Sequence, residues 1–293
     1  MPQMKDMFFE YRYVDICGNP FCISSDSVVV SDADNYAFEY AKKVLSKSGK
    51  DGSVMKVNII GEMPERIKRA VGTDFSDDDE SYAVEITKDE INLFSPTHRG
   101  LIYAVSTLKQ LVESGNVREM LLFDYPDKKI RGYRVFIPGR ENFDDFKRMI
   151  DMLVYYKYNS IMIEVGGAME YKKHPEINSE WVEFCREVHQ SPNEAKRIQK
   201  ETYKDWKKNS IHADNGGGSF ITQDEMRELV AYCRERGLEV IPEVPTLSHS
   251  DYIVRAHREL NERREDMYPD TYCPSNPKTY ELVFDILDEI CDV

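Results

Sequence analysis

Two glutamates and a histidine stand where short apolar runs of the sequence end. Glu164 lies within the run Ser160–Val165, Glu243 lies within Leu238–Val244, and His249 follows a few residues later. A carboxylate at the end of an apolar strand needs a partner, because burying it alone is costly. Carboxylates and imidazoles of this kind can exchange protons, hold hydroxyl groups or bind a divalent metal ion.

Arginines and aromatic residues supply further candidate contacts. Arg131 precedes the expected strand Tyr133–Ile137 and Arg140 follows it, so either guanidinium could donate to a ligand or pair with a surface carboxylate. Tyr171 and Trp206 lie in the long polar stretch 166–219 and could stack on a sugar ring or pack inside that stretch. The other histidines of this half are expected to be surface residues: His174, His189, His212 and His257.

Alternating strand and helix patterns must position these residues. After Pro126, strands are expected at Tyr133–Ile137, Ser160–Val165 and Leu238–Val244, with helices at Phe143–Lys157, after Thr222, and after Asn276. Thr222 and Glu225 form a capping box, and Asn276-Pro277 caps the last helix, with Tyr280, Phe284, Leu287 and Ile290 expected inward. Three βα units predict a parallel sheet or barrel, whose reactive side chains gather at the C-terminal strand ends.

The first part of the chain has a different order of expected strands and helices. Its expected elements run β-α-β-β-α-β and predict a small two-layer α+β domain with helices on one face of the sheet. They are Val28–Val30, Asp34–Lys47, Val54–Ile60, Tyr82–Ile86, Ile91–Phe94, Arg99–Glu113 and Met120–Phe123. We therefore divide the chain at residues 1–125 and 126–293.

The length of the second part limits its fold. A closed (β/α)₈ barrel typically needs about 250 residues, and Lys128–Val293 is shorter and yields three units. Three units cannot close, and an open edge leaves backbone groups unpaired. The expectation is an incomplete TIM-type barrel, in a chain that is a truncated fragment of a longer natural one.

Composition excludes several partners. The formal net charge is −14 and the isoelectric point is about 5.0, so phosphate backbones and anionic membranes are repelled. Six scattered cysteines without a CxxC pair indicate free thiols, and no signal peptide or apolar membrane span is seen. We expect a cytoplasmic protein that binds neither nucleic acid nor membrane; its oligomeric state is left open.

Several motifs, in this order and spacing, resemble glycoside hydrolase family 20, the β-N-acetylhexosaminidase type. They cover the chain from about residue 80 onward and include Arg131-Gly132, Lys157-Tyr158-Asn159, Ile241-Pro242-Glu243 and Ser248-His249-Ser250, besides the stretches 80–87, 97–111, 222–232, 236–237, 274–275 and 279–280. The resemblance implies a glycoside hydrolase without cofactor or metal that acts on terminal sugars of glycans. It implies a substrate-assisted mechanism in which an Asp orients the acetamido group and a neighbouring Glu is the acid/base.

By the same resemblance, that catalytic Asp-Glu pair follows the fourth strand, beyond Val293, so the 293 residues alone are expected to be inactive. The expected substrate-binding residues are Arg131, Arg140, Glu164, Glu243, His249 and Tyr171. The pocket motifs differ from the family pattern. Phe136 and Pro245 stand at positions of acidic residues, and Glu164 stands at the position of a histidine.

Three interpretations follow from these differences. The first is the hydrolase, with Glu164 holding His249 by a charge-assisted hydrogen bond in place of a missing Asp. The second is a family member that binds glycans without cleaving them. The third is a metal-dependent barrel enzyme that uses Glu164, Glu243 and His249 as ligands.

Overall fold

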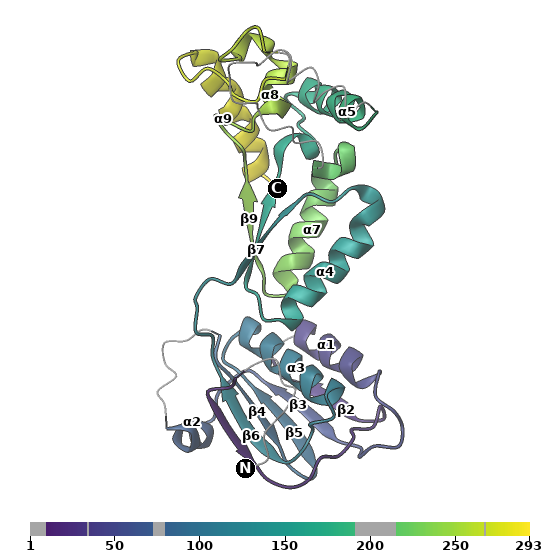
Figure 1. Cartoon of the computed structure of the whole chain (residues 1–293). Coiled ribbons are helices and arrows are strands. Elements are labelled where there is room, and N and C mark those ends of the chain that lie inside the picture. Colours follow the sequence, from purple (N-terminus) through teal and green to yellow (C-terminus); the bar gives the residue numbers. More distant parts are fainter. Residues whose placement is uncertain (1–9, 34, 73–79, 191–214, 267) are drawn as a thin grey trace. The chain divides into compact units, whose positions relative to one another are not determined.

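The chain folds into two compact units. The computed structural model describes residues 10–33, 35–72, 80–190, 215–266 and 268–293 (Figure 1). The first unit consists of Met1–Arg131, Ile150–Asn159 and Glu235–Leu238, and the second of Gly132–Met149, Ser160–Arg234 and Glu239–Val293. Within the described residues, no helix is both long and apolar enough to cross a lipid bilayer.

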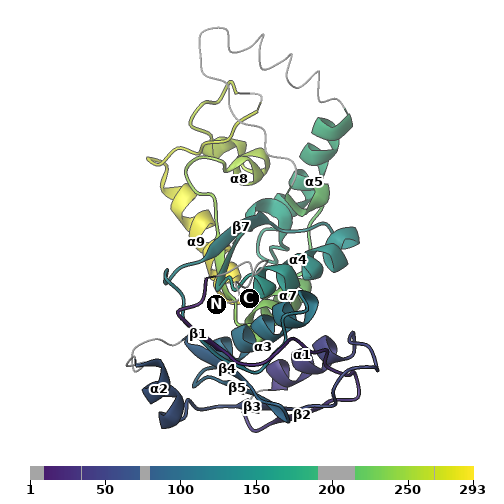
Figure 2. The ribbon, with the colours of Figure 1, turned by 60° about the horizontal axis from the view of Figure 1, so that its bottom comes forward.

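The first unit is built on a six-stranded mixed sheet in the order β1-β6-β4-β5-β3-β2. Its strands are β1 (Tyr13–Ile16), β2 (Val28–Ser31), β3 (Lys56–Ile60), β4 (Tyr82–Ile86), β5 (Glu90–Phe94) and β6 (Met120–Asp124). β2, β3 and β5 are parallel to one another, whereas β4 is antiparallel to β5 and β6. Helices α1 (Asn35–Leu45) and α3 (His98–Glu113) lie together on one face of this sheet (Figures 1 and 2).

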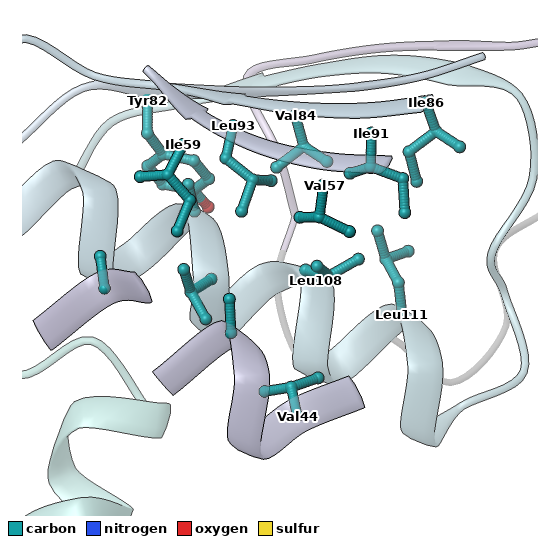
Figure 3. Close-up of a cluster of buried hydrophobic side chains, with 14 of the residues drawn as sticks. Val44, Val57, Ile59, Tyr82, Val84, Ile86, Ile91, Leu93, Leu108 and Leu111 are labelled. Carbon is teal, nitrogen blue, oxygen red and sulfur yellow. The ribbon is translucent and has the colours of Figure 1, made fainter. Parts of the chain in front are cut away.

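The core of this unit lies between that face and the two helices (Figure 3). Val57 and Ile59 are two residues apart in β3, so both side chains point to the same face, where they are almost fully buried. α3 contributes Leu108 and Leu111, which the predicted periodicity placed inward, and both are fully buried. The sequence therefore predicted this helix and its buried face correctly.

Two elements of this unit were not predicted. β1 has four residues, none of them fully buried, and it pairs antiparallel with β6. α2 (Glu65–Val71) is a charged helix of seven residues that ends at Gly72, whose φ is 72°. Ile67 of α2 packs with Ala83 and Phe94 on the sheet face opposite to α1 and α3. The prediction that helices cover one face only is thus wrong.

The second unit contains a parallel sheet in the order β7-β8-β9. Its strands are β7 (Gly132–Phe136), β8 (Ser160–Glu164) and β9 (Glu239–Glu243), and their last residues, Phe136, Glu164 and Glu243, are aligned in register. Helices α4 (Phe143–Tyr155) and α7 (Gln223–Glu235) lie side by side (Figure 1), and the ammonium group of Lys147 lies over the ring of Tyr232. All three predicted strands are present.

Hydrogen bonds at the helix ends follow the predicted caps. The amide of Glu225 donates to the hydroxyl of Thr222 at 3.1 Å, and the Glu225 carboxylate accepts from the Thr222 amide at 2.6 Å. The side chain of Asn276 caps α9 (Pro277–Cys291) by accepting from the Lys278 amide. These reciprocal bonds satisfy amides that the first helical turn leaves without partners.

Other features of the second unit differ from the predictions. Helix α5 (Pro175–Gln190) lies in the stretch taken as polar, and α8 (Asp251–Ala256) follows β9. In α9 the buried stripe runs through Leu282, Val283 and Ile286, while Tyr280 and Phe284 are 50% and 60% exposed. The prediction placed those two aromatic residues inward because they share one helix face. The neighbouring aliphatic face is buried instead.

A matched pair of valines tests the core of the first unit. Val57 is fully buried in β3, whereas Val54 is 64% exposed just before that strand. We expect Val57→Ala to lower the free energy of unfolding by about 2 kcal/mol or more, because it opens a cavity in a close-packed core. Val54→Ala should change it by less than about 0.5 kcal/mol. Urea unfolding of both variants measures this, and equal losses would contradict the assignment.

Candidate functional site

Arg134 lies between the two acidic strand ends of the second unit. Its guanidinium donates through Nη2 to Glu164 Oε2, and through Nε and Nη2 to both carboxylate oxygens of Glu243, the Nη2–Oε1 distance being 3.1 Å. Arg134 and Phe136 are two residues apart in β7 and point to one face, with the guanidinium 5.3 Å from the centre of the Phe136 ring. One cation thus links side chains from three adjacent parallel strands.

The electrostatics of Glu164 reflect its position at the end of β8. Burial raises the pKa of the Glu164 carboxyl above its ordinary value, and the charge of Arg134 acts against this rise. The nearby carboxylate of Glu243 raises the pKa of Glu164 further, whereas the charge of His249 lowers it. Glu164 is 7% exposed, whereas half of the Arg134 side chain is exposed. Solvent therefore reaches the group of Arg134, Glu164 and Glu243 on the side of the arginine.

A buried asparagine fixes the backbone around this group. The Asn215 side chain accepts from the Ile137 amide at 3.0 Å and donates to the carbonyl oxygens of Glu164 and Val165 at 3.1 and 3.2 Å. It therefore joins the residues that follow β7 to the end of β8. The side chain of Asn178 in α5 likewise forms hydrogen bonds with the backbone after β8, at Gly167, Met169 and Tyr171. These bonds satisfy polar backbone groups in a buried loop.

The loop after β9 carries His249 in an uncommon backbone conformation. Leu247 has φ 73° and His249 has φ 54°, both in the left-handed region that side chains other than glycine seldom occupy. Such conformations cost roughly 1–3 kcal/mol each and cluster at functional sites. His249 is exposed and acts on Glu164 through its charge. Arg134 is a hydrogen-bond partner of Glu164 that the sequence did not predict. The direct bond from Glu164 to His249 stays a prediction.

Arg131 lies elsewhere, before the first residue of β7. Its guanidinium donates to the carbonyl oxygens of Lys157 and Lys128 at 2.7 and 2.6 Å, to the Tyr103 hydroxyl at 2.7 Å, and to Glu80. Glu80 is 6% exposed and also accepts from Arg99 and Asn159. Most of the donors of Arg131 are thus engaged within the first unit, in a structural network. Its contact with a sugar stays a prediction.

The structure does not bring Arg140 or Tyr171 to the Arg134 group. Arg140 lies in a short 3₁₀ turn and makes a two-pronged ion pair with Glu225 at 2.8 and 2.9 Å. Tyr171 is fully buried and its hydroxyl donates to the Gly166 carbonyl, so the prediction that its ring stacks on a sugar is wrong. The packing of the loop after β8 therefore fixes the position of the Tyr171 ring. Trp206 and His212 lie outside the described residues.

The metal-ligand interpretation of this group conflicts with Arg134. A guanidinium that bonds both carboxylates occupies the position a divalent cation would take and neutralises the negative charge that would attract one. In the described part of the chain, Glu164, Glu243 and His249 do not form a set of potential ligands within reach of one ion.

Arg134 and Asn215 were missed by the sequence reasoning. The position of Arg134 in the sequence was a usable signal. It is a charged residue in the middle of an apolar strand, and it lies two positions before the strand end, so its side chain shares a face with that end. Asn215 precedes Gly216-Gly217-Gly218, a turn signal that indicates tight backbone but not the two strand ends that the asparagine joins. The family motif instead predicted Arg131 and Arg140 as the arginines that bind the sugar.

The second unit places acidic side chains at the C-terminal ends of parallel strands, which is the arrangement found in α/β barrel folds. Comparison with known families agrees. Residues 134–293 match the family described as glycosyl hydrolase family 20, catalytic domain, and residues 14–125 match glycosyl hydrolase family 20, domain 2. Because the first match alone covers more than half of the sequence, the chain belongs to glycosyl hydrolase family 20.

Individual relatives of the chain are named beta-hexosaminidases. The chain is 28% identical over 235 residues to a beta-hexosaminidase of Vibrio furnissii, and 23% identical over 239 residues to one of Akkermansia muciniphila. Each match covers 73% of this chain, but 35% and 43% of the relative, so the chain spans less than half the length of these curated proteins.

Solved structures share the fold at lower identity. The beta-N-acetylhexosaminidase from Bacteroides fragilis superposes with a TM-score of 0.68 at 16% identity, over 98% of this chain and 54% of the other. The Streptomyces plicatus beta-hexosaminidase variant solved with the product GlcNAc gives 0.66 at 18% identity, over 96% and 55%. The architecture of both units is therefore that of family 20 proteins.

Removing Arg134 should reveal the repulsion between the two carboxylates. We expect Arg134→Met to lower the free energy of unfolding at neutral pH by about 1–2 kcal/mol, because Glu164 is buried while the arginine is half exposed. The folded-state pKa of Glu164 is already raised, so its ionisation costs stability as pH rises, and the variant should raise this pKa further. The deficit should therefore shrink as pH falls through the raised folded-state pKa toward the ordinary glutamate value.

Urea unfolding between about pH 4 and pH 8 measures that deficit. Arg148→Met is the matched control, because Arg148 is a 70% exposed arginine of α4 that pairs with Asp145. It should change stability by less than about 0.5 kcal/mol at every pH. A deficit of Arg134→Met that is independent of pH would contradict the assigned interaction.

The ion pair of Arg140 with Glu225 makes a separate pH prediction. Hydrogen bonds from Arg140 lower the pKa of Glu225 to about 2 despite some burial, and bonds from Thr222 add to this. Because the folded-state value is depressed, the pair stabilises the fold above the ordinary glutamate pKa, and this contribution is lost as pH falls toward 2.

We expect Arg140→Met to move the Glu225 pKa upward toward its ordinary value and to cost roughly 1 kcal/mol at neutral pH. Carboxyl titration by NMR measures the first effect. Arg227→Met, which removes the neighbouring pair with Asp224, should leave the Glu225 pKa in place. An unchanged titration in Arg140→Met would refute this account.

Proposed function

We propose that this family 20 protein is a glycoside hydrolase that removes terminal N-acetylhexosamine from glycans. The family match supports this, as do the curated relatives named beta-hexosaminidases. The related Streptomyces plicatus protein was solved with GlcNAc as its product, which makes an N-acetylated sugar the natural ligand to test first.

The observation that carries the proposal is the Arg134 group at the C-terminal strand ends. Sugar hydroxyls both donate and accept hydrogen bonds, and this group offers carboxylate acceptors beside a half-exposed guanidinium donor. We assign Arg134, Glu164 and Glu243 to the hydroxyls of a terminal sugar, with His249 at the rim. The bonds of Asn215 hold the strand ends in place before the sugar arrives, which reduces the entropy lost on binding.

We also propose how the fold of the chain is divided. We take β7, β8 and β9 with α4, α7 and α9 as the first three units of a (β/α)₈ barrel, which follows a small domain of residues 1–125. The parallel order and the family match support this division. The Asp-Glu pair that the family resemblance implies is assigned to no residue of this sequence. We therefore expect these 293 residues by themselves to bind a sugar without cleaving it.

The cysteines support a reducing compartment for this protein. All six lie in the described part of the chain and none forms a disulfide bond there, and Cys17, Cys22 and Cys291 are exposed, which suits a cytoplasm that keeps thiols reduced. Cytoplasmic localisation is part of the proposal.

A glycan-binding protein without hydrolytic activity is the second candidate. The observation that favours it is the altered pocket, because Glu164 is paired with Arg134 where the family resemblance implies a histidine. Binding of N-acetylhexosamine with no turnover by the natural gene product would support this candidate over the hydrolase.

Glutamate-to-glutamine variants test the proposed sugar contacts. In the natural gene product, Glu164→Gln and Glu243→Gln should each lower kcat/KM for a p-nitrophenyl N-acetyl-β-hexosaminide by about 10–100-fold, since each removes a charged acceptor. Glu228→Gln, an exposed glutamate of α7, is the matched control and should match the wild type. Unchanged kinetics in both pocket variants, with intact folding, would eliminate these residues as sugar contacts.

A further inference from the structure

Two histidines and a glutamate of the second unit, none of them part of the Arg134 group, converge around a single point. His174 precedes α5, Glu176 lies in the first turn of α5, and His257 directly follows α8, which packs against α5. Glu176 Oε1 lies 3.1 Å from His174 Nδ1 and 3.0 Å from His257 Nε2. One potential ligand atom from each of the three residues lies within 4.8 Å of the other two.

The outer nitrogens of both rings face carboxylates as well. His174 Nε2 lies 3.3 Å from Asp285 Oδ2 of α9, and His257 Nδ1 lies 3.5 Å from Glu259 Oε1. All four ring nitrogens therefore point at carboxylate oxygens. A neutral imidazole has one N–H only, so two neutral rings can donate to two of these four contacts. The remaining two contacts would place a nitrogen lone pair against a carboxylate lone pair.

A metal ion between the inner atoms removes this conflict. It would accept the lone pairs of His174 Nδ1 and His257 Nε2, while each outer N–H donates to its carboxylate. That arrangement, a ligating histidine held by a carboxylate, is the usual support of protein zinc sites. Tetrahedral zinc, with bonds of about 2.0–2.1 Å, holds neighbouring ligand atoms roughly 3.3 Å apart, close to the two distances from Glu176.

We propose that His174, Glu176 and His257 bind a zinc ion that ties α5 to α8, with Asp285 and Glu259 orienting the two rings. Two imidazoles and one carboxylate suit zinc better than magnesium or calcium, which prefer oxygen ligands. The Glu176 side chain is 44% exposed, so water can complete the coordination. The site is independent of the proposed glycosidase activity.

Zinc binding is tested on the purified chain at pH 7.5, after treatment with a chelator and dialysis. We expect about one equivalent of zinc to bind and to raise the melting temperature, with magnesium unable to compete. His174→Asn and His257→Asn should each abolish stoichiometric binding and the thermal shift. His98→Gln, which removes an exposed histidine of the first unit, is the matched control and should bind like the wild type.

Asp285→Asn tests the site without removing a metal ligand. Its effect therefore distinguishes weakened coordination from the loss of folding that a histidine variant can cause. Loss of a carboxylate that orients a ligating histidine typically lowers metal affinity by about 10–100-fold without abolishing binding. Cobalt in place of zinc should give bands of nitrogen and oxygen ligation without thiolate charge transfer, which separates this site from the exposed cysteines. Failure of the wild type to bind one equivalent, or equal binding by the folded double variant His174→Asn/His257→Asn, would overturn the proposal.

Discussion

The structure of the candidate site depends on the cost of burying one carboxylate. Glu164 is buried at the end of the strand Ser160–Glu164, after Ile161, Met162 and Ile163, and a lone ionised group there would be unfavourable by several kcal/mol. Arg134 compensates because β7 and β8 run parallel in a register that places its side chain two residues before the aligned strand ends. The same register brings Glu243 within reach. A change of register by one residue would turn the arginine to the opposite face of the sheet.

The start of β7 is held by a second charged network, in the first unit. Glu80 lies buried between Arg99 and Arg131, and Asn159 accepts from the Arg131 amide while it donates to Glu80. The charges are paired, and Arg131, Arg99 and Asn159 also donate to backbone carbonyl oxygens. Buried ionic groups are tolerated when they are paired and hydrogen-bonded in this way. Arg131, which the family resemblance links to a sugar, is a member of this structural network.

Long periodic elements were predictable and short or irregular ones were not. Helix α3 and the strands β7, β8 and β9 have enough apolar residues at regular spacing to determine their type, and the capping box of Thr222 marked the start of α7. β1 has no fully buried residue and α2 buries only Ile67, so neither shows a clear apolar periodicity. In α9 two adjacent helix faces are both apolar, so the sequence did not decide which face would be buried. The position of Glu164 was predicted, but its partner was not, because pairing across strands depends on register.

The left-handed conformation of Leu247 and His249 limits how this loop can vary. Glycine and asparagine adopt such a backbone at little cost, so drift at these two positions should favour them whenever the side chains have no task. Each step in that direction would relax the chain and improve stability while removing the imidazole. Leucine and histidine at these positions therefore cost the fold conformational stability that glycine or asparagine would restore.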